Sequence, residues 1–215
     1  MIDTALKKSF DQRFSLVRTL DKNRLIPESA QASLTLMDAE KGSFFTCFGN
    51  TYYVKETNRY QEMSEDFATR KDYFTTELAC LCLETGLVGH FEWEVDDELE
   101  ISITLEHTSF KHIKDEEGNS VDEDDLDQIA KDKDAIVYAG QKFWYEDDWA
   151  ALYQRNGKEE KVYMYEFENE EGSLSLTIEE WTGSGRDEYK IYLSKSVVPD
   201  QITIISKGAP GDELL

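Results

Sequence analysis

The chain has few of the residues that build disulfide-linked or metal-stabilised proteins. Its 215 residues include only three cysteines, three histidines and three prolines. Three cysteines do not form an even disulfide framework, and Cys80 and Cys82 have no partner ligands at the spacing of a structural zinc site. We therefore expect reduced cysteines, no metal and no cofactor.

Long apolar runs and basic residues are also scarce. No run approaches the ~20 residues that a membrane-spanning helix requires, and the first residues lack the regions of a signal peptide. The chain has 46 acidic and 23 basic residues, which give a net charge of −23. A field of this sign repels phosphate backbones, so nucleic acid is not expected as a partner. We expect a soluble, cytoplasmic protein without a transmembrane segment.

Residues 2–20 are predicted to form one amphipathic helix. At about 3.6 residues per turn, six apolar residues share an arc that Arg13 interrupts: Ile2, Leu6, Phe10, Phe14, Val17 and Leu20. Residues 1–24 carry six basic and three acidic side chains, a local charge of +3 that leaves −26 on the rest. Such a helix packs on its own domain, docks into a partner or makes a peripheral contact with a membrane.

From Gln31 onward the apolar pattern has a period of two, which indicates β-strands. Gly49-Asn50 is a predicted hairpin turn, and the apolar run within Tyr73–Glu84 predicts a strand buried on both faces. The predicted core comprises Tyr53, Val54, Leu78, Leu81, Phe91, Trp93, Ile101, Ile103, Val137, Phe143, Tyr163, Tyr165, Leu176, Ile178, Ile191 and Ile204.

Two stretches, Gly86–Leu105 and Gly172–Leu193, repeat one order of features. Each has a strand after a glycine, a tryptophan beside glutamates, a polar turn (Asp96-Asp97; Gly183–Asp187) and a second strand. We infer an internal duplication of about 90 residues. The predicted divisions are an N-terminal helix and linker (1–30), a first β repeat (31–113), an acidic linker with a short helix from Asp122–Asp125 through Ala130 (114–134), a second β repeat (135–206) and a tail (207–215).

This order of features resembles the bacterial family called domain of unknown function 4178. The resemblance rests on the motifs GNTYYVKETNRY and AGQKFWYEDDWAALYQ, the two tryptophan–glutamate strands, and the closing VVPDQITII. The resemblance covers about residues 32–206 and leaves residues 1–30 outside. It implies a β-rich cytoplasmic domain with no assigned catalytic residue. Members of the family tend to be encoded beside envelope-stress and polyamine-related proteins, so an association with the envelope is one expectation.

Four glutamates are the candidate binding residues. Glu92 and Glu94 flank Trp93 and share one face of their strand, whereas Glu179 and Glu180 precede Trp181. They are either solvated or line one groove for a partner or a cationic ligand such as a polyamine. No catalytic residue is predicted, because the chain lacks a nucleophile elbow, a phosphate-binding glycine loop and a metalloprotease helix.

The sequence thus predicts a mainly β protein with one N-terminal amphipathic helix. Two tandem related β subdomains form curled sheets or half-barrels, or alternatively the two layers of one sandwich. The predicted function is an acidic binding or scaffold module that acts through a protein partner. The alternatives are an inhibitor that mimics DNA and an enzyme or binding protein for a cationic ligand.

Overall fold

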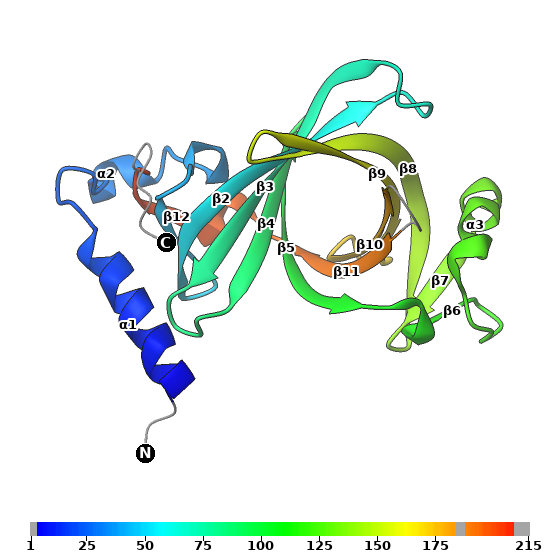
Figure 1. The fold of residues 1–215 in the computed structure, drawn as a ribbon, viewed down its shortest axis with the longest axis horizontal. Coiled ribbons are helices and arrows are strands. Elements are labelled where there is room, and N and C mark those ends of the chain that lie inside the picture. Colours follow the sequence, from blue (N-terminus) through cyan, green and yellow to red (C-terminus); the bar gives the residue numbers. More distant parts are fainter. Residues whose placement is uncertain (1–3, 184–187, 209–215) are drawn as a thin grey trace. The chain divides into compact units, whose positions relative to one another are not determined.

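A computed structural model describes residues 4–183 and 188–208. It is built mainly of antiparallel strands with one N-terminal helix, which confirms the predicted fold class (Figure 1). The chain forms two compact units whose segments interleave along the sequence. Unit 1 comprises Met1–Thr57, Glu77–Ile101 and Val197–Leu215, and unit 2 comprises Asn58–Thr76 and Ser102–Ser196. The predicted repeats follow sequence order, so the two divisions of the chain do not coincide.

Unit 1 has the strand order β12-β1-β2-β3-β4-β5. Three of these strands, β2, β3 and β5, also contribute residues to unit 2. The elements are α1 (Thr4–Arg18), α2 (Glu28–Gln31), η1 (Leu36–Asp38), β1 (Phe44–Cys47), β2 (Asn50–Met63), β3 (Arg70–Cys82), β4 (Val88–Val95), β5 (Leu99–Thr108), η4 (Pro199–Gln201) and β12 (Ile202–Ser206).

Unit 2 continues from β5 in the order β5-β11-β10-β9-β8-β7-β6, and β8 also pairs with the end of β2. These strands curl into a partial ring (Figure 1). The elements are η2 (Phe110–His112), β6 (Ile113–Lys114), η3 (Glu123–Asp125), α3 (Leu126–Asp132), β7 (Ala135–Tyr138), β8 (Gln141–Arg155), β9 (Lys158–Glu168), β10 (Leu174–Thr182) and β11 (Glu188–Ser196).

The two series of strands have matching orders. In unit 1, β12 lies beside β1 and the series runs on to β5; in unit 2, β6 lies beside β7 and the series runs to β11. The short strands β1 and β7 have 4 residues each, and the strands β2 and β8 that follow have 14 and 15. An internal duplication would produce this order, and the duplication itself stays a prediction.

The turn between β1 and β2 consists of Phe48 and Gly49, because Cys47 pairs directly with Asn50. The predicted turn at Gly49-Asn50 is therefore wrong by one residue. Phe48 and Gly49 have φ angles of 49° and 77°. Two consecutive positive φ angles are typical of type I′ hairpin turns, whose twist matches that of the strands they connect.

Most of the predicted core is buried, and Trp93, Val137 and Tyr163 are only half-buried. For Val137 the prediction is wrong by one position. Ile136 pairs with the buried Phe143 and takes the core face of β7, because a shift of one residue reverses every side chain of a strand. Residues 75–82 of β3 are all buried, which confirms the predicted two-sided burial of this strand.

The short helix predicted from Asp122–Asp125 through Ala130 is present as η3 and α3. The Asp122 side chain accepts a hydrogen bond from the backbone N–H of Asp124 and caps η3. Leu126 and Ile129 of α3 pack in the larger core cluster of unit 2, with apolar residues of β7 to β11. The predicted turn at Gly183–Asp187 and the predicted tail at 207–215 lie largely outside the described residues.

The N-terminal helix α1 packs through a face that differs from the predicted apolar arc. Leu16 is buried, whereas Phe10, Phe14 and Val17 are exposed. Among the residues that the structure describes, no helix has the length and apolar character needed to cross a membrane.

Candidate functional site

The four candidate glutamates belong to different units. Glu92 and Glu94 lie half-buried on β4 of unit 1, and Glu179 and Glu180 lie on β10 of unit 2. Glu179 and Glu180 are consecutive strand residues and point to opposite faces. The groove that would combine all four therefore stays a prediction.

Glu179 is a buried carboxylate with only 3% of its surface exposed. The Tyr60 hydroxyl donates a hydrogen bond to Glu179 Oε1 at 3.0 Å, and the Trp181 indole N–H donates one to Oε2 at 2.7 Å. The ring of Tyr153 packs against both donors, with centroids 4.7 Å from Tyr60 and 5.2 Å from Trp181. Hydrogen bonds of this kind offset the cost of removing a charge from water.

Lys190 lies directly opposite Glu179 in the pairing of β10 with β11. Its ammonium nitrogen is 4.1 Å from the centroid of the Trp181 ring, within the range of a cation–π interaction. An aromatic ring beside a buried carboxylate is an arrangement suited to a cationic ligand. Here Lys190 of the same chain places a cation on this ring.

Glu180 lies directly opposite Tyr163 in the pairing of β10 with β9, so it shares a face with a second group of polar residues, in which tyrosines donate to aspartates. Tyr145 and Tyr163 both donate hydrogen bonds to the carboxylate of Asp148, and Tyr165 donates one to Asp127 at 2.9 Å. Burial, followed by the hydrogen bond to an aspartate, raises the pKa of each tyrosine. The phenols therefore stay protonated at neutral pH and act as donors rather than as bases.

The sequence pattern does not predict these tyrosine–aspartate contacts. The bulge of β8 between Tyr145 and Asp147 changes which residues share a face, and nothing in the local sequence indicates it. The alternation of Tyr163 and Tyr165 on β9 was the one available signal.

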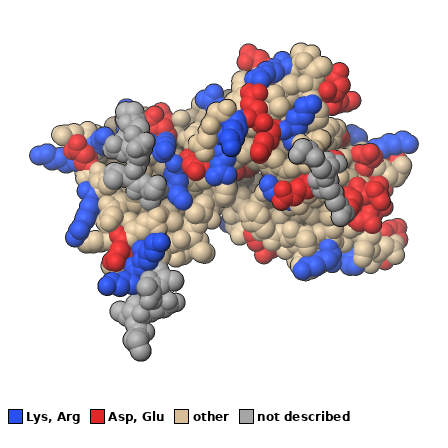
Figure 2. Space-filling model, in the orientation of Figure 1, with Lys and Arg blue, Asp and Glu red and all other residues tan. Residues whose placement is uncertain are grey.

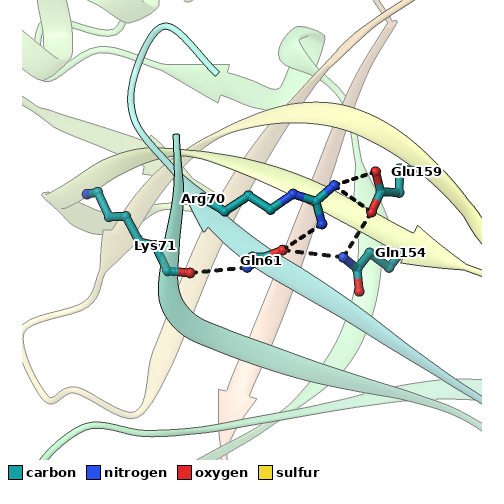
Figure 3. Close-up of polar contacts among 5 residues, drawn as sticks. All are labelled: Gln61, Arg70, Lys71, Gln154 and Glu159. Carbon is teal, nitrogen blue, oxygen red and sulfur yellow. Dashed lines mark hydrogen bonds and ion pairs between the residues drawn. The ribbon is translucent and has the colours of Figure 1, made fainter. Parts of the chain in front are cut away.

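Another polar network joins residues of β2 and β3 to residues of β8 and β9 in unit 2 (Figure 3). Arg70 donates two hydrogen bonds to the Glu159 carboxylate, at 2.8 and 3.0 Å, and one to the Gln61 side-chain oxygen at 3.1 Å. Gln61 in turn donates to the backbone oxygen of Lys71 at 3.2 Å. These hydrogen bonds connect Arg70 of β3 with Gln61 of β2 and Glu159 of β9.

The turn between β4 and β5 carries the most concentrated negative charge of unit 1. We call Glu94, Asp96, Asp97, Glu98 and Glu100 the acidic hairpin; no basic residue lies between them in the sequence. Burial raises the pKa of Glu100, and the negative charges of Glu94, Glu98 and Asp96 raise it further. On the molecular face drawn in Figure 2, by contrast, acidic and basic side chains are interspersed.

The cysteines and histidines form no metal cluster among residues 4–183 and 188–208. Cys47, Cys80 and Cys82 are buried, and none of the three is in a disulfide. Burial, with a smaller contribution from Glu77, raises the pKa of the Cys80 thiol, which stays protonated at neutral pH. Nδ1 of His90 lies 2.9 Å from a carboxylate oxygen of the buried Glu77.

Taken together, the antiparallel strands and the N-terminal helix define a β-rich protein. The family model for "Domain of unknown function (DUF4178)" matches residues 40–199. The chain belongs to this family, which confirms the resemblance and leaves α1 and α2 outside the matched region. No curated protein and no solved structure matches the chain.

Proposed function

We propose that this protein is a non-catalytic binding module and that the acidic hairpin of unit 1 binds a basic segment of a protein partner. The observation that carries the proposal is the concentration of carboxylates in the acidic hairpin, with no basic residue between them in the sequence. The pKa of Glu100 agrees with it, because burial and then the charges of the neighbouring hairpin acids raise that pKa. Like charges close together favour the protonated form of a carboxyl group, so the shift is consistent with a local excess of negative charge.

Lysine or arginine side chains of a partner would relieve this repulsion, and the bound state would lower the Glu100 pKa. Because the hairpin is largely exposed, the attraction would be long-ranged at low ionic strength and weak at high salt. Such a surface contributes more to the rate of association and to partner choice than to the affinity.

The test uses the full chain and a fluorescein-labelled peptide of alternating lysine and glycine as the probe, followed by fluorescence anisotropy. The variant Glu94→Gln/Glu98→Gln/Glu100→Gln should bind the peptide about 5- to 10-fold more weakly, since each charge contact at a surface is worth about 0.5 kcal/mol. The matched control, Glu160→Gln/Glu170→Gln/Glu171→Gln, has the same net charge and changes exposed acids of unit 2. The affinity of this control for the peptide should fall by less than ~2-fold.

Equal losses in the two variants would mean that the peptide responds to net charge alone, and the proposal would then be wrong. The same conclusion follows if the unmodified chain does not bind the peptide at low salt.

We further propose that the protein works in the cytoplasm. The three buried cysteines support this, since none of them is in a disulfide and thiols persist in a reducing compartment. Rapid thiol labelling of the unfolded protein, taken directly from lysed cells, should modify all three. Protection of a cysteine pair would contradict the assignment.

A further inference from the structure

The helix α1 is attached to the rest of unit 1 by one of its faces. Leu16 is 2% exposed and belongs to a cluster with Phe44, Tyr53 and Leu81. Nη1 of Arg13 donates hydrogen bonds to the backbone oxygens of Leu83 at 2.6 Å and Glu84 at 2.9 Å. These contacts fix the orientation of the helix and determine which side faces solvent.

The side that faces solvent is apolar. Phe10, Phe14 and Val17 are 58%, 48% and 42% exposed, and they share one stripe because they lie four and three positions apart. The rings of Phe10 and Phe14 stack with centroids 6.1 Å apart. We call these three residues the α1 stripe. Leu87 and Val88, which are also exposed, follow Gly86, where an added Cβ would lie 2.8 Å from Ser9 Oγ of α1.

Basic side chains accompany the α1 stripe. Lys7, Lys8 and Arg18 are exposed on the same helix, and the Arg18 guanidinium lies 4.4 Å from the centroid of the Phe14 ring. Lys22 and Arg24 follow the helix in the sequence, so residues 1–24 are net basic in a chain whose net charge is −23.

We propose that α1 lies in the plane of an anionic lipid surface, with the α1 stripe among the acyl chains and its basic residues against the headgroups. A helix with exposed aromatic residues and flanking lysine and arginine has the composition of interfacial helices. Its 15 residues span about 22 Å, a length suited to lying on a bilayer and too short to cross one. The basic charge selects anionic lipid, and the acidic remainder of the chain would be repelled from that surface.

The experiment is co-sedimentation of the full chain with vesicles of phosphatidylglycerol and, separately, of phosphatidylcholine. We expect binding to phosphatidylglycerol only. The variant Lys7→Glu/Arg18→Glu should reduce the partition coefficient at least ~10-fold, because each basic residue near an anionic surface contributes measurably to binding. Lys131→Glu/Lys158→Glu changes the net charge equally at exposed sites of unit 2 and should bind as the unmodified chain does.

The apolar contribution is tested in the same assay. Phe10→Ser/Phe14→Ser should also lower the partition coefficient at least ~10-fold, since it removes two exposed rings from the stripe. Its control, Leu105→Ser/Val198→Ser, removes two apolar side chains that are 51% and 60% exposed elsewhere, and should leave binding unchanged.

Three results would overturn the proposal: no binding to phosphatidylglycerol, equal binding to both lipids, or equal loss in each variant and its control. Sedimentation velocity tests for a fourth result that would overturn it. If the unmodified chain is a dimer and Phe10→Ser/Phe14→Ser is a monomer, then a second copy covers the α1 stripe, and the lipid proposal is wrong.

Discussion

The hydroxyl groups of Tyr60 and Tyr138 make the same kind of hydrogen bond in two environments of unit 2. Tyr60 donates to Glu179, which is 3% exposed, at 3.0 Å. Tyr138 donates to Glu106 at 2.8 Å on the exposed surface. Water replaces a lost donor at the surface, but it has little access to Glu179, so the two bonds differ in their effect on stability.

Tyr60→Phe should therefore lower the free energy of unfolding by about 1.5–3 kcal/mol, the usual range for a buried hydrogen bond to a charged group. Tyr138→Phe, the matched control, should change it by less than ~0.5 kcal/mol. Urea denaturation followed by tryptophan fluorescence measures both. Similar losses in the two variants would show that Glu179 is accessible to water in solution.

The raised pKa of Glu100 has a consequence for stability that depends on pH. A carboxyl group that binds its proton more tightly in the folded state destabilises the fold when it is ionised, and this cost disappears as the pH falls through the raised pKa. Glu100→Gln removes the charge and keeps the shape. It should stabilise the protein by about 0.3 kcal/mol at neutral pH, given the exposure of this residue.

In acid, Glu100 is protonated in both the folded and the unfolded state, so the variant and the unmodified chain should then be equally stable. At neutral pH, added salt should reduce the difference in stability between them. Thermal unfolding at several pH values measures this trend. A difference that grows toward acid would contradict the assigned sign of the pKa shift.

At the scale of elements, turns and helix faces were less predictable than strands. The alternation of apolar residues identified the strands, whereas the exact turn at Phe48-Gly49 depended on register. The periodicity of α1 predicts an apolar arc, but it does not show whether such a face packs internally. The packing of α1 depends on Leu16 and Arg13, and the partners of Arg13 are 70 and 71 positions away.

A comparison of two glycines distinguishes the cost of backbone strain from the cost of a steric contact with α1. Gly49 and Gly86 both have a φ of 77°. A Cβ at Gly49 would meet no atom within 4 Å, whereas one at Gly86 would lie 2.8 Å from Ser9 Oγ and 3.4 Å from Arg13 Nε. Gly49→Ala should lower the free energy of unfolding by about 1 kcal/mol through its backbone conformation alone. Gly86→Ala should lower the free energy of unfolding by at least ~0.5 kcal/mol more than Gly49→Ala does.

Gly86→Ala should also increase tryptic cleavage after the basic residues of α1, because the added methyl group weakens the attachment of the helix. Differential scanning calorimetry and limited proteolysis measure the two effects. Equal costs at both glycines would mean that α1 does not pack against the 83–86 segment in solution.

At the scale of the whole molecule, the units share strands. Because β2, β3 and β5 each contribute residues to both units, we expect one cooperative unfolding transition. Trp93→Phe leaves tryptophans only in unit 2, namely Trp144, Trp149 and Trp181. Its fluorescence should then report the same urea midpoint as far-UV circular dichroism of the entire chain. Two separate midpoints would show that the units unfold independently.

This substitution is suited to the purpose because the Trp93 indole N–H is buried and has no hydrogen-bond partner among the described residues. Phenylalanine would remove that uncompensated donor.

Long-range contacts limit what the sequence can predict about the site. Glu179 was identified through its neighbour Trp181, but its burial also depends on Tyr60, which lies 119 positions away in the sequence. The interleaved units likewise follow from strand pairing, which one sequence does not specify.

The position of β12 beside β1 has a consequence during protein synthesis. Phe44 donates its backbone N–H to Ser206 Oγ across 162 positions. While the ribosome is translating the intervening residues, β1 of the nascent chain has no β12 to pair with, and its open edge is available for misfolding and aggregation. A chaperone that shields this edge until residues 202–206 emerge would therefore increase the yield of native protein.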